Sequence, residues 1–71
     1  MFTQNQLNIL KEHNFKYNHN YKMFELYDIH QDIFYYIHPN NILEIVYHSP
    51  IIQKYIQFNS FEEMINHIYA N

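Results

Sequence analysis

The segment 38–41, His-Pro-Asn-Asn, constrains the fold most, because it separates two segments that are typical of β-strands. Those segments, 33–38 and 42–48, are rich in β-branched and aromatic residues, which fit a pleated sheet better than a helix. Pro39 favours the first corner of a type I turn, and Asn41 tolerates the left-handed backbone that closes a three-residue hairpin loop. The sequence therefore predicts an antiparallel hairpin around this turn.

Side chains alternate between the two faces of such a hairpin. One face is almost wholly apolar and consists of Ile33, Tyr35, Ile37, Leu43, Ile45 and Tyr47. The opposite face is mixed and consists of Phe34, Tyr36, His38, Ile42, Glu44, Val46 and His48. We expect the first face to pack on the core, and we call the second the open face because we expect no helix on it.

The segments before the hairpin predict a helix and a further strand. Thr3 and Gln6 form a capping box, so a helix is expected over about 4–13, with Asn14 ending it and Phe15 folding back onto its last turn. A polar loop is expected over Tyr17-Asn18-His19-Asn20. Residues 22–28 then read as a strand, followed by a turn over 29–32. In that strand Phe24 and Leu26 point inward, whereas the open face gains Met23, Glu25 and Tyr27.

After the hairpin, Ser49-Pro50 ends the strand, because proline cannot donate to a ladder. Residues 51–58 are interpreted either as a short fourth edge strand or as an extended segment with Ile52 and Ile56 packed down. A final helix begins after Ser60, which forms a second capping box with Glu63. Its apolar stripe is Phe61, Met64, Ile65 and Ile68.

This order predicts one α+β domain over residues 1–71. The architecture is a two-layer sandwich, in which a three- or four-stranded antiparallel meander carries an N-terminal and a C-terminal helix on one face, in the order α-β-β-β-(β)-α. A core at this chain length rarely supplies more than ~3–5 kcal/mol net, so we expect modest stability.

Composition excludes several function classes. The chain has no cysteine, no glycine and no arginine, so it lacks disulfides, thiolate metal sites and glycine-rich phosphate loops. The chain has only four lysines and a net charge of −3, so we do not expect it to bind nucleic acid. The sequence shows no signal peptide and no apolar run long enough for a membrane span, so we expect a cytoplasmic protein with no membrane partner.

Catalytic and metal sites are not indicated. The six histidines have no partner at the i,i+4 spacing of a helical metal site, and Ser60 and Thr3 are assigned to helix caps. The sequence therefore predicts no enzyme activity, no metal and no cofactor.

The remaining hypothesis is protein binding through the open face, because aromatic surface with a polar rim is typical of protein–protein contacts. The expected partner-binding residues are Met23, Tyr27, Phe34, Tyr36, His38, Glu44, Val46 and His48. The chain would then be a non-enzymatic inhibitor or adaptor that occludes a surface of a larger protein. Its size and lack of catalytic motifs are similar to those of mobile-element anti-defence proteins such as anti-CRISPR proteins. One alternative function is a homo-oligomeric accessory subunit, whose dimer interface is the open face. A structural alternative is that residues 51–58 cover the open face.

A third alternative comes from the element order. The order α-β-β-β-α resembles that of double-stranded-RNA-binding domains and of the HicA-type ribonuclease toxins that share their fold. Where the toxins begin a strand with Gly-Ser-His, this chain has Asn20-Tyr21-Lys22. The resemblance implies an RNA-binding or ribonuclease-toxin module.

Overall fold

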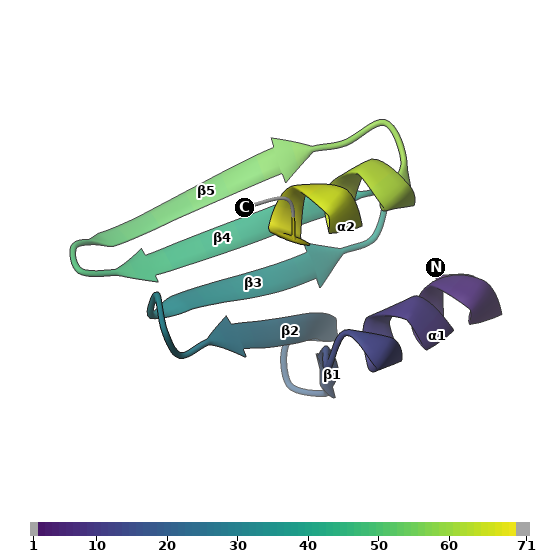
Figure 1. The fold of residues 1–71 in the computed structure, drawn as a ribbon, viewed down its shortest axis with the longest axis horizontal. Helices are drawn as coiled ribbons and strands as arrows, with labels where there is room; N and C mark the ends of the chain where they lie inside the picture. Colours follow the sequence, from purple (N-terminus) through teal and green to yellow (C-terminus); the bar gives the residue numbers. More distant parts are fainter. Residues whose placement is uncertain (1, 70–71) are drawn as a thin grey trace.

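The computed structural model describes residues 2–69 and shows an α+β domain built from one five-stranded antiparallel sheet and two helices (Figure 1). The elements in chain order are α1 (Gln4–Glu12), β1 (Lys16–Asn18), β2 (Met23–Asp28), β3 (Ile33–His38), β4 (Ile42–His48), β5 (Ile51–Gln57) and α2 (Phe61–Tyr69). Each strand pairs with the next one along the chain, so the sheet is a simple meander. The α+β class is confirmed, whereas the sheet has five strands instead of the predicted three or four.

The central hairpin of β3 and β4 has the predicted register. His38 pairs with Ile42, and the ladder continues without a break to the pair of Ile33 with Tyr47. The predicted type I turn is wrong, because Asn40 as well as Asn41 has a left-handed backbone, with φ = 68° and φ = 60°. A positive φ at the third turn position is the signature of a type II turn, which asparagine tolerates when glycine is absent.

The two preceding hairpins share one loop design. Their four-residue loops follow Asn18 and Asp28, and in each case the side-chain Oδ1 accepts hydrogen bonds from the backbone N–H groups two and three residues further on. Each loop ends in a residue with a left-handed backbone, Lys22 in the first and Asp32 in the second. The side chain thus fixes the start of the turn, and the left-handed residue returns the chain to the sheet.

This design corrects two sequence predictions. Tyr17 and Asn18, predicted as part of a polar loop, belong to strand β1 (Lys16–Asn18), which pairs with β2. Lys22 belongs to the turn, so β2 begins at Met23. The short strand escapes a pattern-based assignment because three residues contain too little alternation, and its apolar member, Tyr17, is 43% exposed.

The start and the end of α1 and the start of α2 agree with the sequence predictions. The Thr3 side chain accepts from the backbone N–H of Gln6, and the Gln6 side chain accepts from the backbone N–H of Thr3, which completes the capping box of α1. At the other end Asn14 is left-handed, and the N–H of Phe15 donates to the carbonyl of Leu10. These are the contacts of a Schellman motif. For α2, the Ser60 hydroxyl accepts from the backbone N–H of Glu63, which is one of the two hydrogen bonds of the predicted capping box.

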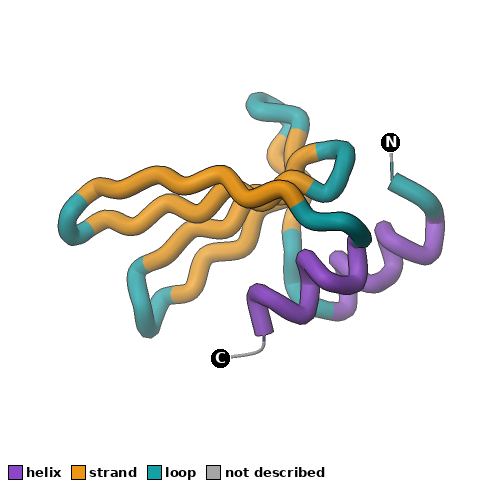
Figure 2. Tube along the Cα trace, turned by 90° about the horizontal axis from the view of Figure 1, so that it is seen from above, coloured by secondary structure: helices purple, strands orange, loops and turns teal. Residues whose placement is uncertain are grey.

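The two helices lie on the same side of the sheet (Figure 2). The core between the two layers combines the apolar hairpin face with the predicted stripe of α2. Its buried members are Leu10, Phe15, Ile33, Tyr35, Ile37, Leu43, Ile45, Phe61, Met64, Ile65 and Ile68. The opposite side of the sheet carries no helix among the described residues, so the two sheet faces have the roles that alternation predicts.

Strand β5 forms one edge of the sheet, and β1 forms the other. A two-residue turn, Ser49-Pro50 with a cis peptide bond, connects β4 to β5, and β5 pairs with β4 over its full length. The segment is thus an edge strand and does not cover the open face. Ile56 packs against the core, whereas Ile52 is 44% exposed, because the β4–β5 turn extends beyond the helices (Figure 1).

Candidate functional site

The structure brings the eight predicted partner-binding residues together on the open face. The strand register places Tyr27 opposite Phe34, Phe34 opposite Val46, and Tyr36 opposite Glu44. The same alternation adds residues from both edge strands, namely Lys16, Asn18, Ile51, Gln53, Tyr55 and Gln57. Sequence reasoning missed the contribution of β5, because it left the pairing of that segment undecided.

Three aromatic side chains form a continuous row across the centre of this face. We call Tyr27, Phe34 and Tyr36 the aromatic row. The ring centroids of Tyr27 and Phe34 are 4.5 Å apart, and those of Phe34 and Tyr36 are 5.9 Å apart with nearly parallel rings. His48 lies against the same Phe34 ring, with centroids 5.1 Å apart. Because each ring supports its neighbour, the row presents an ordered apolar surface.

Glu44 sits beside the aromatic row and is only 8% exposed. Its Oε1 lies 2.8 Å from Nε2 of His38, and its Oε2 accepts from the side-chain amide of Gln53. That amide also donates to the hydroxyl of Tyr55, 2.8 Å away. A buried carboxylate is tolerated when such partners replace water. Glu44 therefore links His38 of β3 and Gln53 of β5 across the open face.

A hollow of about 220 Å³ opens next to Glu44 and is lined by Tyr21, Met23, Tyr36, Glu44 and Val46. Tyr21 comes from the β1–β2 loop and is 68% exposed. Burial raises the pKa of the Tyr36 hydroxyl, and the nearby carboxylates of Glu25 and Glu44 raise it further. The hydroxyl therefore keeps its proton to higher pH than a free tyrosine and remains a hydrogen-bond donor.

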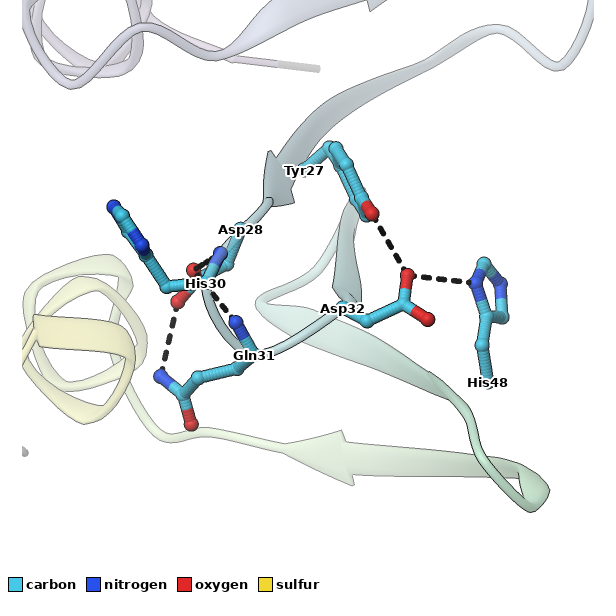
Figure 3. Close-up of polar contacts among 6 residues, drawn as sticks. All are labelled: Tyr27, Asp28, His30, Gln31, Asp32 and His48. Carbon is cyan, nitrogen blue, oxygen red and sulfur yellow. Dashed lines mark hydrogen bonds and ion pairs between the residues drawn. The ribbon is translucent and has the colours of Figure 1, made fainter.

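A second polar cluster lies at the end of the aromatic row, on the β2–β3 loop (Figure 3). The Tyr27 hydroxyl donates to Oδ1 of Asp32 at 2.8 Å, and Nδ1 of His48 lies 3.2 Å from the same oxygen. The hydrogen bond from Tyr27 lowers the pKa of Asp32, and the same bond raises the pKa of Tyr27. Asp32 links side chains of β2 and β4 from a turn, a role that the sequence pattern did not indicate.

The other carboxylate of this loop has a different role. Asp28 accepts from the backbone N–H groups of His30 and Gln31, and its Oδ2 accepts from the Gln31 side chain at 2.9 Å. These contacts stay within the loop (Figure 3). Asp28 therefore shapes the turn, and Asp32 connects the turn to the open face.

The two histidines of the open face lie in separate clusters. His38 and His48 pair with different carboxylates. In the part of the chain that the structure describes, no three histidine, aspartate or glutamate side chains are grouped so that they could hold a metal ion. Within residues 2–69, neither of the two nine-residue helices has the length to cross a bilayer.

Comparison of the chain with protein-family models, with curated proteins and with solved structures gives no match.

Proposed function

We propose that the open face binds the surface of a larger protein, so that the chain acts as a non-enzymatic inhibitor or adaptor. The observation that carries this proposal is the aromatic row on the face that neither helix covers. Tyrosine and phenylalanine supply large contact area with few rotatable bonds, and ordered aromatic clusters with a polar surround are typical of binding hot spots. Here the polar surround consists of His38, Gln53 and the Asp32 cluster.

Pre-ordering supports the proposal energetically. A partner that docks on mobile side chains loses affinity, because each immobilised rotamer-rich side chain costs about 0.5–1.5 kcal/mol. The rings of the aromatic row are already stacked, and Glu44, Gln53 and Tyr55 already share hydrogen bonds. Much of the ordering cost is therefore met during folding.

Charge placement favours a protein partner over RNA. The four lysines lie on separate elements, with Lys11 on α1, Lys16 on β1, Lys22 in the β1–β2 loop and Lys54 on β5. RNA binding depends on clustered cations that release counterions from phosphates. An RNA partner would be retained at low salt and released steeply as salt rises, which a filter-binding series measures directly.

The test compares two double variants in capture from a lysate of the native host. Phe34→Ala with Tyr36→Ala removes the centre of the aromatic row, and Glu62→Ala with Asn66→Ala changes exposed positions of α2 as the matched control. Both variants must first show the circular dichroism spectrum of the unmodified chain. We expect the row variant to lose a protein that the unmodified chain and the control retain, as measured by quantitative mass spectrometry. Equal retention by all three chains would contradict the proposal.

A further inference from the structure

The two edges of the sheet differ in a way that the proposed function does not use. Strand β1 is three residues long, whereas β5 is seven residues long and pairs with β4 without a bulge. Edge strands leave a row of backbone donors and acceptors without partners, and proteins normally protect long edges with charged side chains such as lysine, with proline, with bulges or with covering segments. Strand β5 carries one such lysine, Lys54. Among the described residues, nothing covers β5, and its residues 51–55 are all exposed.

The outward backbone groups of β5 can be assigned from one hydrogen bond at the end of the ladder. The N–H of Phe58 donates to the carbonyl of Asn41, which extends the register of the β4–β5 pair by one residue. Inward and outward groups alternate along a strand. Gln53, Tyr55 and Gln57 therefore direct their N–H and C=O groups away from β4, into solvent.

We propose that β5 pairs antiparallel with β5 of a second copy of this chain, with the two-fold axis passing between the two Tyr55 residues. The two five-stranded sheets then join into one continuous sheet. Tyr55 faces Tyr55 of the second copy, and Gln53 faces Gln57. Cross-strand aromatic pairs stabilise a sheet, and the facing amides can exchange hydrogen bonds.

Charge selects this register over its neighbour. An axis through Lys54 would place two like charges directly opposite each other, which is destabilising. The Tyr55-centred register sets Lys54 against Ile56, and the Lys54 ammonium group already lies over the Tyr47 ring of its own chain, 5.6 Å from the centroid. The Lys54 ammonium group thus points away from the proposed β5–β5 interface.

The same reasoning favours the edge over the open face as the contact between copies. The open face carries the carboxylates of Glu25, Asp32 and the buried Glu44 but one lysine, Lys16, so stacking two copies of it would add like charge. Lys54, in contrast, is the sole charged residue of β5. A second copy is also a better occupant than a flexible peptide. Its β5 is already extended in a hairpin, so it avoids the ordering cost that a disordered segment meets on binding.

The first test is molar mass by light scattering over a concentration series. We expect the mass to rise from that of the 8.9 kDa chain to twice that value. Tyr55→Lys should raise the dimer dissociation constant by about tenfold, equivalent to about 1.4 kcal/mol, because it places two cations on the axis. Tyr21→Lys makes the same charge change at a comparably exposed loop position and should leave the constant unchanged. A mass that stays at one chain throughout overturns the proposal.

The second test reads the register. The chain has no cysteine, so a single Cys variant reports only its own pairing. Under mild oxidation, Tyr55→Cys should form a covalent dimer rapidly, because facing Cα atoms lie within disulfide reach. Lys54→Cys and Tyr21→Cys should react slowly. A dimer in which Lys54→Cys links faster than Tyr55→Cys, or one that dissociates with Phe34→Ala and Tyr36→Ala, overturns this pairing.

Discussion

At the scale of single residues, a chain without glycine must use other residues wherever the backbone turns left-handed. Within residues 2–69 five positions do so, and four of them hold Asn or Asp, whose short polar side chains tolerate that conformation. Lys22 is the exception, with φ = 56°. Its long side chain gains nothing from the conformation, so this position carries a local cost that the other four largely avoid.

Replacing Lys22 by Asn should therefore stabilise the domain. We expect the free energy of unfolding in urea to increase by about 1 kcal/mol, at the lower end of the usual cost of a left-handed residue. Lys22→Ala removes the same charge and keeps the steric cost, so it should give no comparable gain. Equal stabilisation by both variants would indicate a charge effect and contradict the backbone explanation.

Asp32 gives a prediction about acid. Because its pKa is lowered in the folded chain, mainly by the hydrogen bond from Tyr27, the ionised carboxylate stabilises the fold above its ordinary pKa of about 3.9. That contribution disappears as the pH falls through the lowered value. Tyr27→Phe should raise the pKa of Asp32 in an NMR titration of the carboxyl carbon. It should also reduce the decrease in the free energy of unfolding at acid pH. An unchanged pKa would show that the bond is not formed in solution.

At the scale of secondary-structure elements, short caps decide where the helices begin. The Ser60 hydroxyl accepts from the N–H of Glu63 at the start of α2, and α2 supplies four buried core residues. Ser60→Ala should lower the free energy of unfolding by about 1 kcal/mol, the usual cost of losing such a cap. Ser49→Ala, in the β4–β5 turn, is the matched control and should change stability little. Similar losses in both variants would mean that the cap adds nothing.

The elements also show how far the sequence carries a prediction. Alternation and the three-residue loop length agreed on the β3–β4 hairpin, so its register and its two faces could be predicted residue by residue, whereas the turn type was predicted wrongly. Strand β1 could not be predicted, because a three-residue strand is defined by its partner β2. The placement of residues on the open face was predictable to the same degree. The residues of the open face follow from alternation, but the burial of Glu44 depends on Gln53 and Tyr55, whose strand the pattern left undecided.

At the scale of the whole molecule, buried and hydrogen-bonded tyrosines make the stability of the fold decrease at alkaline pH. Burial raises the pKa of Tyr35 and Tyr36, and the bond to Asp32 raises that of Tyr27. Above the ordinary tyrosine pKa of about 10, the folded chain holds protons that the unfolded chain has lost, so its stability falls as the pH rises. Urea midpoints should decline above this pH, and Tyr35→Phe should reduce the decline. A flat profile would contradict the assignment.

The unequal edges of the sheet also determine whether assembly can continue. A sheet that can pair with other copies at both of its edges assembles without limit, as in cross-β fibres. Assembly stops when the second edge offers too few backbone groups for pairing. Two copies joined through their long β5 edges would carry the three-residue β1 at both outer ends. Such an assembly is closed: it terminates at two subunits and cannot extend into a filament.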